Sequence, residues 1–239
     1  MSAPTPTVVL VHGAFADAAS WSGVIDELQR EGVRVLAPPN PLRGLASDAA
    51  YIASVAAQID GPVVLAGHSY GGALITVAGT ADNVVGLVYV AAYVLEEGES
   101  LGELQGRFPD SPLVSSLEQW SYPTAEGGSA TEVTITQEAF PSVFAADVPA
   151  GTTKVLAAAQ RPLAMGAFTE KAAAAAWKTK PSWALVAGAD RAINPDVERF
   201  GAERAAATVV EIEGASHAVA VSQPEAVARV ILDAVRATG

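Results

Sequence analysis

Residues 62–72, which read PVVLAGHSYGG, decide the fold of this 239-residue chain. The apolar run at residues 62–66 is typical of a short buried strand, and residues 70–80 have the pattern of a helix. The turn between them, GHSYG at residues 67–71, matches G-x-S-x-G in the strand–turn–helix setting that this motif requires. Glycines at both ends remove Cβ atoms that would clash, while Ser69 takes a strained backbone conformation. The motif predicts a reactive Ser69 hydroxyl at a helix N-terminus, and the flanking strand and helix disfavour the alternative of a glycine-rich turn that merely contains a serine.

Outward from this turn, short β-branched runs alternate with longer alanine-rich stretches. Such alternation predicts a mostly parallel sheet covered by helices on both faces. We expect a helix cap at Ser20, and helix starts at Asn194-Pro195 and at Ser222-Gln223-Pro224. The strands are expected at residues 7–11, 34–37, 62–66, 84–93, 183–187 and 208–212, and the helices at residues 21–30, 47–60, 70–80, 195–206 and 224–237.

The alternation stops in the middle of the chain. Residues 95–180 predict a hairpin around Tyr122 and residues 133–136, helices at 137–146 and 150–160, and a short helix in the alanine run at 172–176. We interpret this segment as a mainly helical lid inserted after one strand, over the carboxyl edge of the sheet, where open α/β sheets bind ligands. Residues 1–94 and 181–239 would then form the core, and residues 95–180 the lid.

Composition excludes several function classes. Fourteen Lys and Arg residues against 26 Asp and Glu residues give a net charge of −12, which disfavours nucleic-acid and membrane-surface partners. The chain has no cysteine, which excludes disulfides, thiolate metal sites and cysteine nucleophiles. Its three histidines are too far apart for a short metal-binding motif, so we expect neither a metal nor a cofactor. The N-terminal segment shows no signal-sequence pattern and no apolar run could span a bilayer, so a cytoplasmic location is expected.

The chain resembles the α/β-hydrolase superfamily, and within it the small bacterial esterases related to plant methyl-ester esterases and hydroxynitrile lyases. The resemblance covers nearly the whole chain. It rests on HGAFADAASW at 12–21, GHSYGG at 67–72, Gly-Ala-Asp at 188–190 and SHAVAVSQPEAV at 216–227. It implies an α/β-hydrolase fold with a serine nucleophile, a histidine base, an acid and an oxyanion hole.

The three histidines differ in their surroundings. His217 lies in a loop after the last predicted strand, where the resemblance places the general base. His68 adjoins Ser69 within the turn, and we expect it to pack or hydrogen-bond beneath that turn. His12 follows the first strand, and we expect it to order the loop there.

The acid should lie between Ser69 and His217 in chain order. Asp190 follows the strand at 183–187 by two residues, which places it at the carboxyl edge of the sheet, and we choose it over Asp196. Asp196 is explained by the N-terminus of the next helix and is the reserve. The remaining aspartates in this interval are Asp82, at the opposite edge, and Asp110 and Asp147, in the lid. Glutamates of the lid are a minor alternative.

Ester hydrolysis also needs donors for the tetrahedral oxyanion. The backbone N–H of Tyr70, directly after the nucleophile, should be one. By the family pattern the other is Ala14, with Phe15 as the alternative. Trp21 is expected in the core.

The leading hypothesis is a serine esterase, monomeric or homodimeric, that cleaves small uncharged or apolar esters through an acyl-enzyme. A lactonase, thioesterase or perhydrolase would use the same triad, and a non-catalytic small-molecule binder could retain it. Ala218 stands where hydroxynitrile lyases have a lysine, which disfavours cyanohydrin cleavage. The lid should supply apolar walls, and for most of the candidates the favoured alternative is a place in the lid's own core: Leu101, Leu104, Phe108, Trp120, Phe140, Phe144, Met165 and Phe168.

Overall fold

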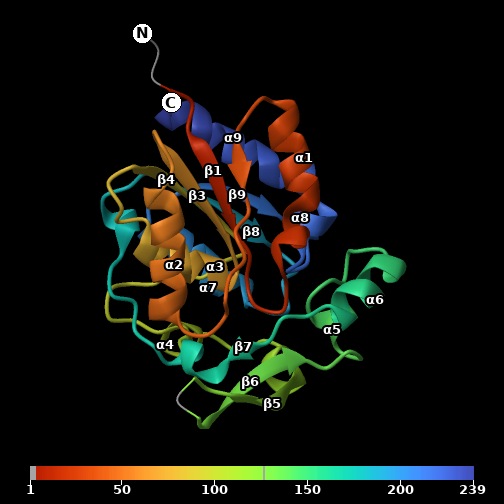
Figure 1. Cartoon of the computed structure of the whole chain (residues 1–239). Coiled ribbons are helices and arrows are strands. Elements are labelled where there is room, and N and C mark those ends of the chain that lie inside the picture. The colour runs from red at the N-terminus through yellow and green to blue at the C-terminus, as the bar shows by residue number, and fades with distance from the viewer. Residues whose placement is uncertain (1–3, 126) are drawn as a thin grey trace.

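A six-stranded sheet, parallel throughout, forms the centre of the molecule. The computed structural model describes residues 4–125 and 127–239. Residues 1–3 of the expected core and residue 126 of the expected lid therefore lie outside the described residues. The strand order is β2-β1-β3-β4-β8-β9, with every pair parallel (Figure 1). The strands are β1 (Thr7–Val11), β2 (Val35–Leu36), β3 (Val63–His68), β4 (Val84–Val90), β8 (Ser182–Ala187) and β9 (Thr208–Ile212).

Helices cover both faces of this sheet (Figure 1). One face packs on α1 (Ser22–Arg30), α8 (Val219–Ser222) and α9 (Pro224–Thr238), and the other on α2 (Leu45–Ala57), α3 (Tyr70–Ala78) and α7 (Pro195–Arg204). Side chains of β1 alternate between the two cores, with Val9 and Val11 on one side and Val8 and Leu10 on the other. Burial on both faces explains why β1, β3, β4 and β8 have nearly continuous apolar sequences, whereas the edge strand β9 is mostly exposed.

The first helix begins differently from the prediction. A 3-10 turn, η1 (Ala18–Trp21), precedes α1, and its cap is Asp17, whose carboxylate accepts from Ala19 N at 2.8 Å. The predicted cap at Ser20 is wrong, because the Ser20 hydroxyl donates instead to the Asp17 carbonyl oxygen at 2.6 Å. The predicted start at Asn194 is confirmed, since its side chain accepts from Asp196 N.

The inserted segment is not mainly helical. Its three strands form an antiparallel sheet in the order β5-β6-β7, which confirms the predicted hairpin. They are accompanied by short helical pieces. The elements are α4 (Leu101–Gln105), η2 (Val114–Ser116), β5 (Leu117–Pro123), β6 (Ser129–Ile135), α5 (Phe140–Val143), α6 (Ala150–Ala158), β7 (Leu163–Ala164), η3 (Met165–Phe168) and η4 (Ala176–Lys178).

Contacts between residues distant in sequence explain why one predicted helix is absent and another is shorter than expected. The alanine run at 172–176 is mostly irregular, because Ala172 N donates to Glu99 O at 2.9 Å and Ala172 O accepts from Gly98 N at 2.8 Å. The helix expected at 137–146 shrinks to α5, because Phe144 O accepts from Ala218 N instead of continuing the helical ladder. In both places the backbone is paired with another part of the chain.

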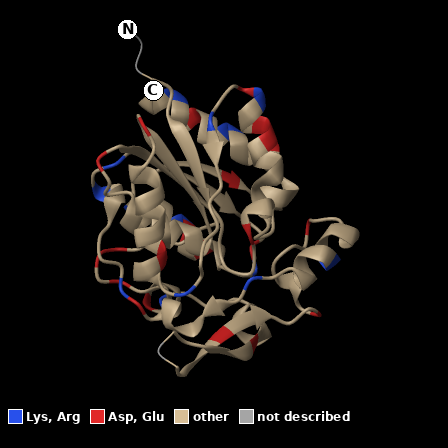
Figure 2. Ribbon diagram, viewed as in Figure 1, with Lys and Arg blue, Asp and Glu red and all other residues tan. Residues whose placement is uncertain are grey.

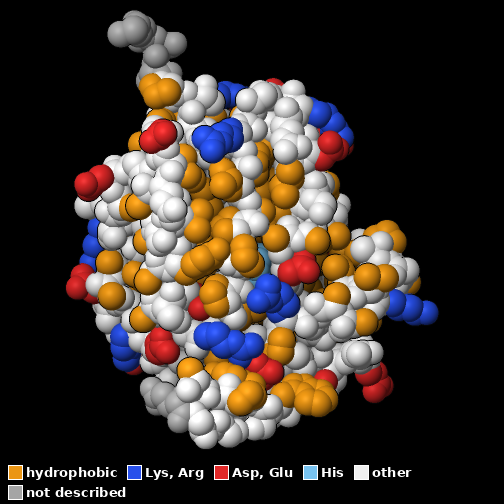
Figure 3. All heavy atoms as spheres, in the orientation of Figure 1, with side chains coloured by type: hydrophobic (Ala, Val, Ile, Leu, Met, Phe, Trp, Pro, Cys, Tyr) orange, Lys and Arg blue, Asp and Glu red, His pale blue; other side chains and the backbone are white. Residues whose placement is uncertain are grey.

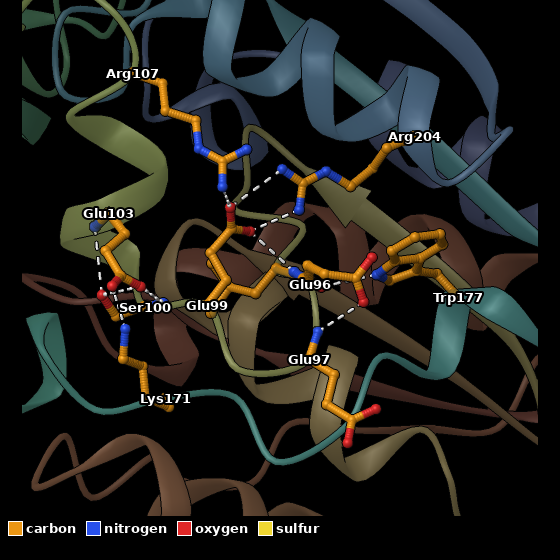
Figure 4. A network of polar contacts seen from close by, with 10 residues as sticks. Glu96, Glu97, Glu99, Ser100, Glu103, Arg107, Lys171, Trp177 and Arg204 are labelled. Carbon is orange, nitrogen blue, oxygen red and sulfur yellow. Dashed lines mark hydrogen bonds and ion pairs between the residues drawn. The ribbon is translucent and has the colours of Figure 1, made fainter.

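The base of the inserted segment is fixed to the core by a buried carboxylate (Figure 4). Glu99 is 4% exposed and its two oxygens lie 2.6 Å from the guanidinium groups of Arg107 and Arg204. Glu99 Oε2 also accepts from Glu96 N at 2.9 Å. Since Arg204 belongs to α7, this cluster joins the first turn of the insertion to a helix of the core.

Replacing Glu99 with glutamine is expected to lower the free energy of unfolding by about 2 kcal/mol, because charge-assisted hydrogen bonds to the two arginines are lost in a buried place. The matched control is Glu103→Gln, whose partner Lys171 is 52% exposed. Glutamine still serves the capping box with Ser100, so this control should change stability by less than about 0.5 kcal/mol. Urea unfolding of the three proteins measures the difference, and equal losses in both variants would contradict this role of Glu99.

Charged residues lie mainly on the outer surfaces of the helices and loops (Figure 2). Among the described residues, none of the helices has both the length and the hydropathy that a bilayer crossing requires.

Candidate active site

Ser69 sits in the turn between β3 and α3 with a strained backbone. Its φ is 56° and its ψ −122°, a region that non-glycine residues seldom adopt. A Cβ atom at Gly67 would lie 2.4 Å from Gly71 O, and one at Gly71 would lie 2.3 Å from Val11 O. Only glycine fits at these two places, so the motif is what permits the turn.

His217 and Asp190 meet at the carboxyl edge of the sheet. Asp190 follows β8 and His217 follows β9, and these two strands are neighbours. His217 Nδ1 lies 2.5 Å from Asp190 Oδ2, and both side chains are almost fully buried. Asp190 Oδ1 accepts from Ala192 N at 2.7 Å and from Ile193 N at 2.9 Å. These three contacts fix the carboxylate in one orientation against the imidazole.

The inserted segment holds the loop that carries His217. Ala218 N donates to Phe144 O at 2.8 Å, and the Ser216 hydroxyl contacts both Phe144 O and the Asp147 carboxylate. The Phe144 ring packs edge-on against the His217 ring, with centroids 4.8 Å apart. Residues on either side of His217 are therefore tied to the segment that covers the site.

Ser69 and His217 line the same small cavity of about 20 Å³. Ala14 and Tyr70 line it as well. The structure thus brings all of the predicted site residues together, since Asp190 contacts His217 from behind the cavity.

Two residues that line this cavity have backbone N–H groups available for a ligand: Ala14, in the loop after β1, and Tyr70, at the start of α3. Within the described residues, no acceptor binds the N–H of Ala14 or that of Tyr70. Phe15 N is already bound, because it donates to Arg161 O at 3.0 Å. This hydrogen bond favours Ala14 over the alternative, Phe15, whose ring lines the cavity.

The other two histidines support the loops around the site, as expected. His68 Nε2 lies 2.8 Å from His217 O, and burial lowers the pKa of His68 well below its ordinary value. His12 Nε2 accepts from Asn40 N at 2.9 Å, and Asn40 Nδ2 donates to His12 O. Burial also lowers the pKa of His12, so both rings are neutral supports. Trp21 lies in the core, fully buried, edge-on to His68.

The remaining aspartate candidates lie elsewhere. Asp196 is at the N-terminus of α7 and pairs with Arg199 at 2.7 Å. Asp147 binds Ser216, and Asp110 lines a groove outside the cavity. Across the described ranges, no three potential metal-ligating side chains converge on one point.

Tyr70 also anchors α2 to the turn that carries Ser69. Its hydroxyl donates to Asp48 Oδ2 at 3.0 Å, and Asp48 accepts from Arg43 N at 3.0 Å as well. Burial raises the pKa of Asp48, and burial together with the Asp48 charge raises the pKa of Tyr70. The phenol therefore stays a neutral donor.

An outer groove of about 250 Å³ adjoins the cavity, and Leu113 and Phe168 belong to the walls of both. Of the expected lid residues, Leu101 and Phe168 line the inner cavity and Met165 the outer groove. Leu104, Phe108 and Trp120 line neither, and Trp120 is 54% exposed on the hairpin.

A third groove, of about 270 Å³, lies between residues 15–20 and the α5–α6 region, and Phe140 and Phe144 line it. Figure 3 shows hydrophobic side chains gathered on this side of the molecule.

Sequence reasoning missed several residues around the site, Leu163 and Ala192 of the cavity wall among them. Tyr93, Leu113 and Ile193 line the inner cavity, and Glu198 is buried in α7. Only Tyr93 had a signal, because it ends the apolar run at residues 84–93 and so falls at the carboxyl edge. The others depend on how distant segments pack.

Comparison with known proteins agrees with this architecture. A sequence model described as the alpha/beta hydrolase family matches residues 8–230. Because this match spans most of the 239 residues, the chain belongs to the alpha/beta hydrolase family.

Three known proteins are similar to this chain in sequence or in structure. A carbendazim hydrolyzing esterase from Nocardioides sp. (strain SG-4G) is 35% identical over 109 residues, which cover 39% of this chain and 44% of that protein. The crystal structure of polyneuridine aldehyde esterase is 19% identical with a TM-score of 0.81, covering 96% of this chain and 99% of that one. A pyrethroid hydrolase from Sphingobium faniae JZ-2 is 22% identical with a TM-score of 0.77, covering 97% and 98%. The two structural likenesses show a shared fold.

Proposed function

We propose that this protein is a serine hydrolase that cleaves carboxylic esters of small uncharged or apolar substrates through an acyl-enzyme. The observation that carries the proposal is the 2.5 Å contact between His217 Nδ1 and Asp190 Oδ2, beside a cavity that Ser69 and His217 share. The relatives named above support ester substrates, since all three are named as esterases or hydrolases.

His217 is the general base. Because its Nδ1–H donates to Asp190, the lone pair of Nε2 is free to take the proton of the Ser69 hydroxyl. The hydroxyl oxygen then attacks the ester carbonyl carbon, and the resulting imidazolium returns its proton to the departing alcohol. Water, deprotonated by the same nitrogen, attacks the acyl-enzyme and releases the acid and Ser69.

The N–H groups of Ala14 and Tyr70 bind the oxyanion of the two tetrahedral intermediates. Both residues line the cavity, and Tyr70 N is the first N–H of α3, where the helix dipole adds positive potential. One such donor is worth about 3 kcal/mol in the barrier.

The size of the cavity suggests how the substrate lies. A volume of about 20 Å³ holds about one water molecule, so a substrate enters only when the walls move. Leu113 and Phe168 stand between this cavity and the outer groove, whose lining is apolar apart from Gln105 and Asp110. The small group of the ester then lies at Ser69, and the larger apolar group extends past Phe168 into the groove.

Replacing Phe168 with alanine is expected to favour bulky esters. The ratio of kcat/KM for p-nitrophenyl octanoate to that for the acetate should rise about tenfold, because several methylene groups gain room in the wall. The matched control is Val155→Ala, an exposed side chain of the third groove, which should leave the ratio unchanged. An unchanged ratio in Phe168→Ala would contradict this position of the larger group.

Turnover of a panel of p-nitrophenyl esters, lactones, thioesters and peroxide-dependent substrates tests the proposal against its alternatives. Highest kcat/KM on simple esters is the expected result. Tight binding of a small molecule without turnover or fluorophosphonate labelling would indicate a non-catalytic binder instead. Monomeric or homodimeric state remains a prediction for size-exclusion measurements.

A further inference from the structure

Glu198 is a buried carboxyl group with no role in the mechanism above. It lies on α7 and is 3% exposed. Its Oε2 accepts from Ala187 N at 3.0 Å, while no group among the described residues hydrogen-bonds its Oε1. A buried polar atom without a partner is rare in proteins and requires an explanation.

The surroundings of Glu198 do not favour a charge on it. Arg199, the next residue in the chain, is 45% exposed and pairs with Asp196 and Glu211. Tyr93 follows β4, and its hydroxyl donates to Gln105 Oε1 at 2.6 Å and so is not available to Glu198. Burial raises the pKa of Glu198 well above its ordinary value, and the charge of Asp190 raises that pKa further. Burial thus favours the protonated form of Glu198, which carries a hydrogen that it can donate.

Asp190 has room for one more hydrogen bond. An ionised carboxylate offers about four lone-pair sites. Oδ1 uses two for Ala192 N and Ile193 N, and Oδ2 uses one for His217. One site on Oδ2 is left, and Glu198 is held close by, since Ala187 N binds Glu198 and Ala187 O accepts from Asp190 N at 3.1 Å.

We propose that Glu198 is a positioning residue whose neutral carboxyl group donates a hydrogen bond to the Asp190 carboxylate and so fixes that carboxylate against His217. One proton then satisfies both the free oxygen of Glu198 and the remaining site of Asp190. It also leaves a single negative charge on two adjacent buried carboxyl groups, which could not both ionise without repulsion. The inference rests on the proposed function, because it assigns to Asp190 the task of orienting His217.

Two replacements of Glu198 distinguish the effect of its hydrogen-bond donor from the effect of its packing. Glu198→Gln keeps the shape and supplies an N–H donor that cannot ionise, so kcat and KM should stay within about threefold of the parent. Glu198→Leu keeps the volume but removes the donor, so kcat should fall about tenfold or more with KM nearly unchanged. Glu203→Gln, on the exposed side of the same helix, is the matched control and should behave as the parent. A Glu198→Gln variant as impaired as Glu198→Leu would overturn the proposal, as would a folded and fully active Glu198→Leu.

The pH dependence of stability tests whether Glu198 is protonated in the folded protein, and it requires no measurement of ester turnover. A carboxyl group with a raised pKa in the folded state favours folding most below its ordinary pKa, and this contribution is lost as pH rises toward the raised value. The melting temperature of Glu198→Gln should therefore exceed that of the parent increasingly above about pH 5. If the melting temperatures of the two proteins depended on pH in the same way, the proposal that Glu198 is neutral would be overturned. If the parent shows the expected pH dependence but no ester turnover, the proposed function fails and the protonation of Glu198 stands.

Discussion

Replacing Ser69 with alanine is expected to abolish ester turnover and fluorophosphonate labelling while the fold remains intact. Loss of the nucleophile of such a triad lowers kcat by about a millionfold, because no other group forms the acyl-enzyme. The strained turn depends on Gly67 and Gly71 and not on the serine hydroxyl, so circular dichroism and the melting temperature should change little. The measurements are kcat on p-nitrophenyl acetate and mass-spectrometric detection of the labelled protein.

The matched control for this experiment is Ser54→Ala, an exposed position on α2, which should retain full activity and labelling. His217→Ala should be as damaging as Ser69→Ala, and the double variant no worse than either, because the residues act as a unit. Appreciable turnover by Ser69→Ala would show that another group attacks the ester, and a parent protein without turnover or labelling would remove the enzyme proposal.

Replacing Asp190 with asparagine is expected to lower kcat by about ten thousandfold with little change in KM. Asparagine can still accept from Ala192 N and Ile193 N, so the loop should keep its shape. It no longer provides the negative charge that orients the His217 tautomer and stabilises the imidazolium. The measurement is the pair of kinetic constants on one ester, with near-ultraviolet circular dichroism as the check on packing.

The control for Asp190→Asn is Asp196→Asn, which removes the same charge from a residue at the start of α7. Its partner Arg199 also pairs with Glu211, so activity should stay within about twofold of the parent. A larger loss in Asp196→Asn than in Asp190→Asn would make Asp196 the acid.

Local sequence was sufficient for most of the core. β-branched runs identify β1 and β9 to the residue. β1 is buried along its whole length, whereas the edge strand β9 is mostly exposed and is marked by its Thr and Val residues. The inserted segment was less predictable because its backbone pairs with distant residues. The alanine run at 172–176 has strong helical preference, yet Ala172 pairs with residues 98 and 99. Such pairing leaves no mark on the local sequence.

The residues of the candidate site likewise fall into those that the local sequence predicts and those that depend on tertiary packing. Ser69 follows from a contiguous motif, and Asp190 and His217 follow from strand ends that share one edge of the sheet. Leu113 and Phe168 separate the cavity from the outer groove only because of how the insertion folds. Glu198 looks like an ordinary helix charge in the sequence, and its burial beside Asp190 becomes visible only in three dimensions.

The hydrogen bonds from the loop of His217 to Phe144 and Asp147 limit how this enzyme can be re-engineered. A chimera that receives a foreign insertion to change its specificity would also lose the contacts that support the loop of His217. Residues 144–147 should therefore be kept with the core in any exchange, and the transferred piece should begin after them. An exchange that includes residues 144–147 is therefore expected to change turnover as well as specificity.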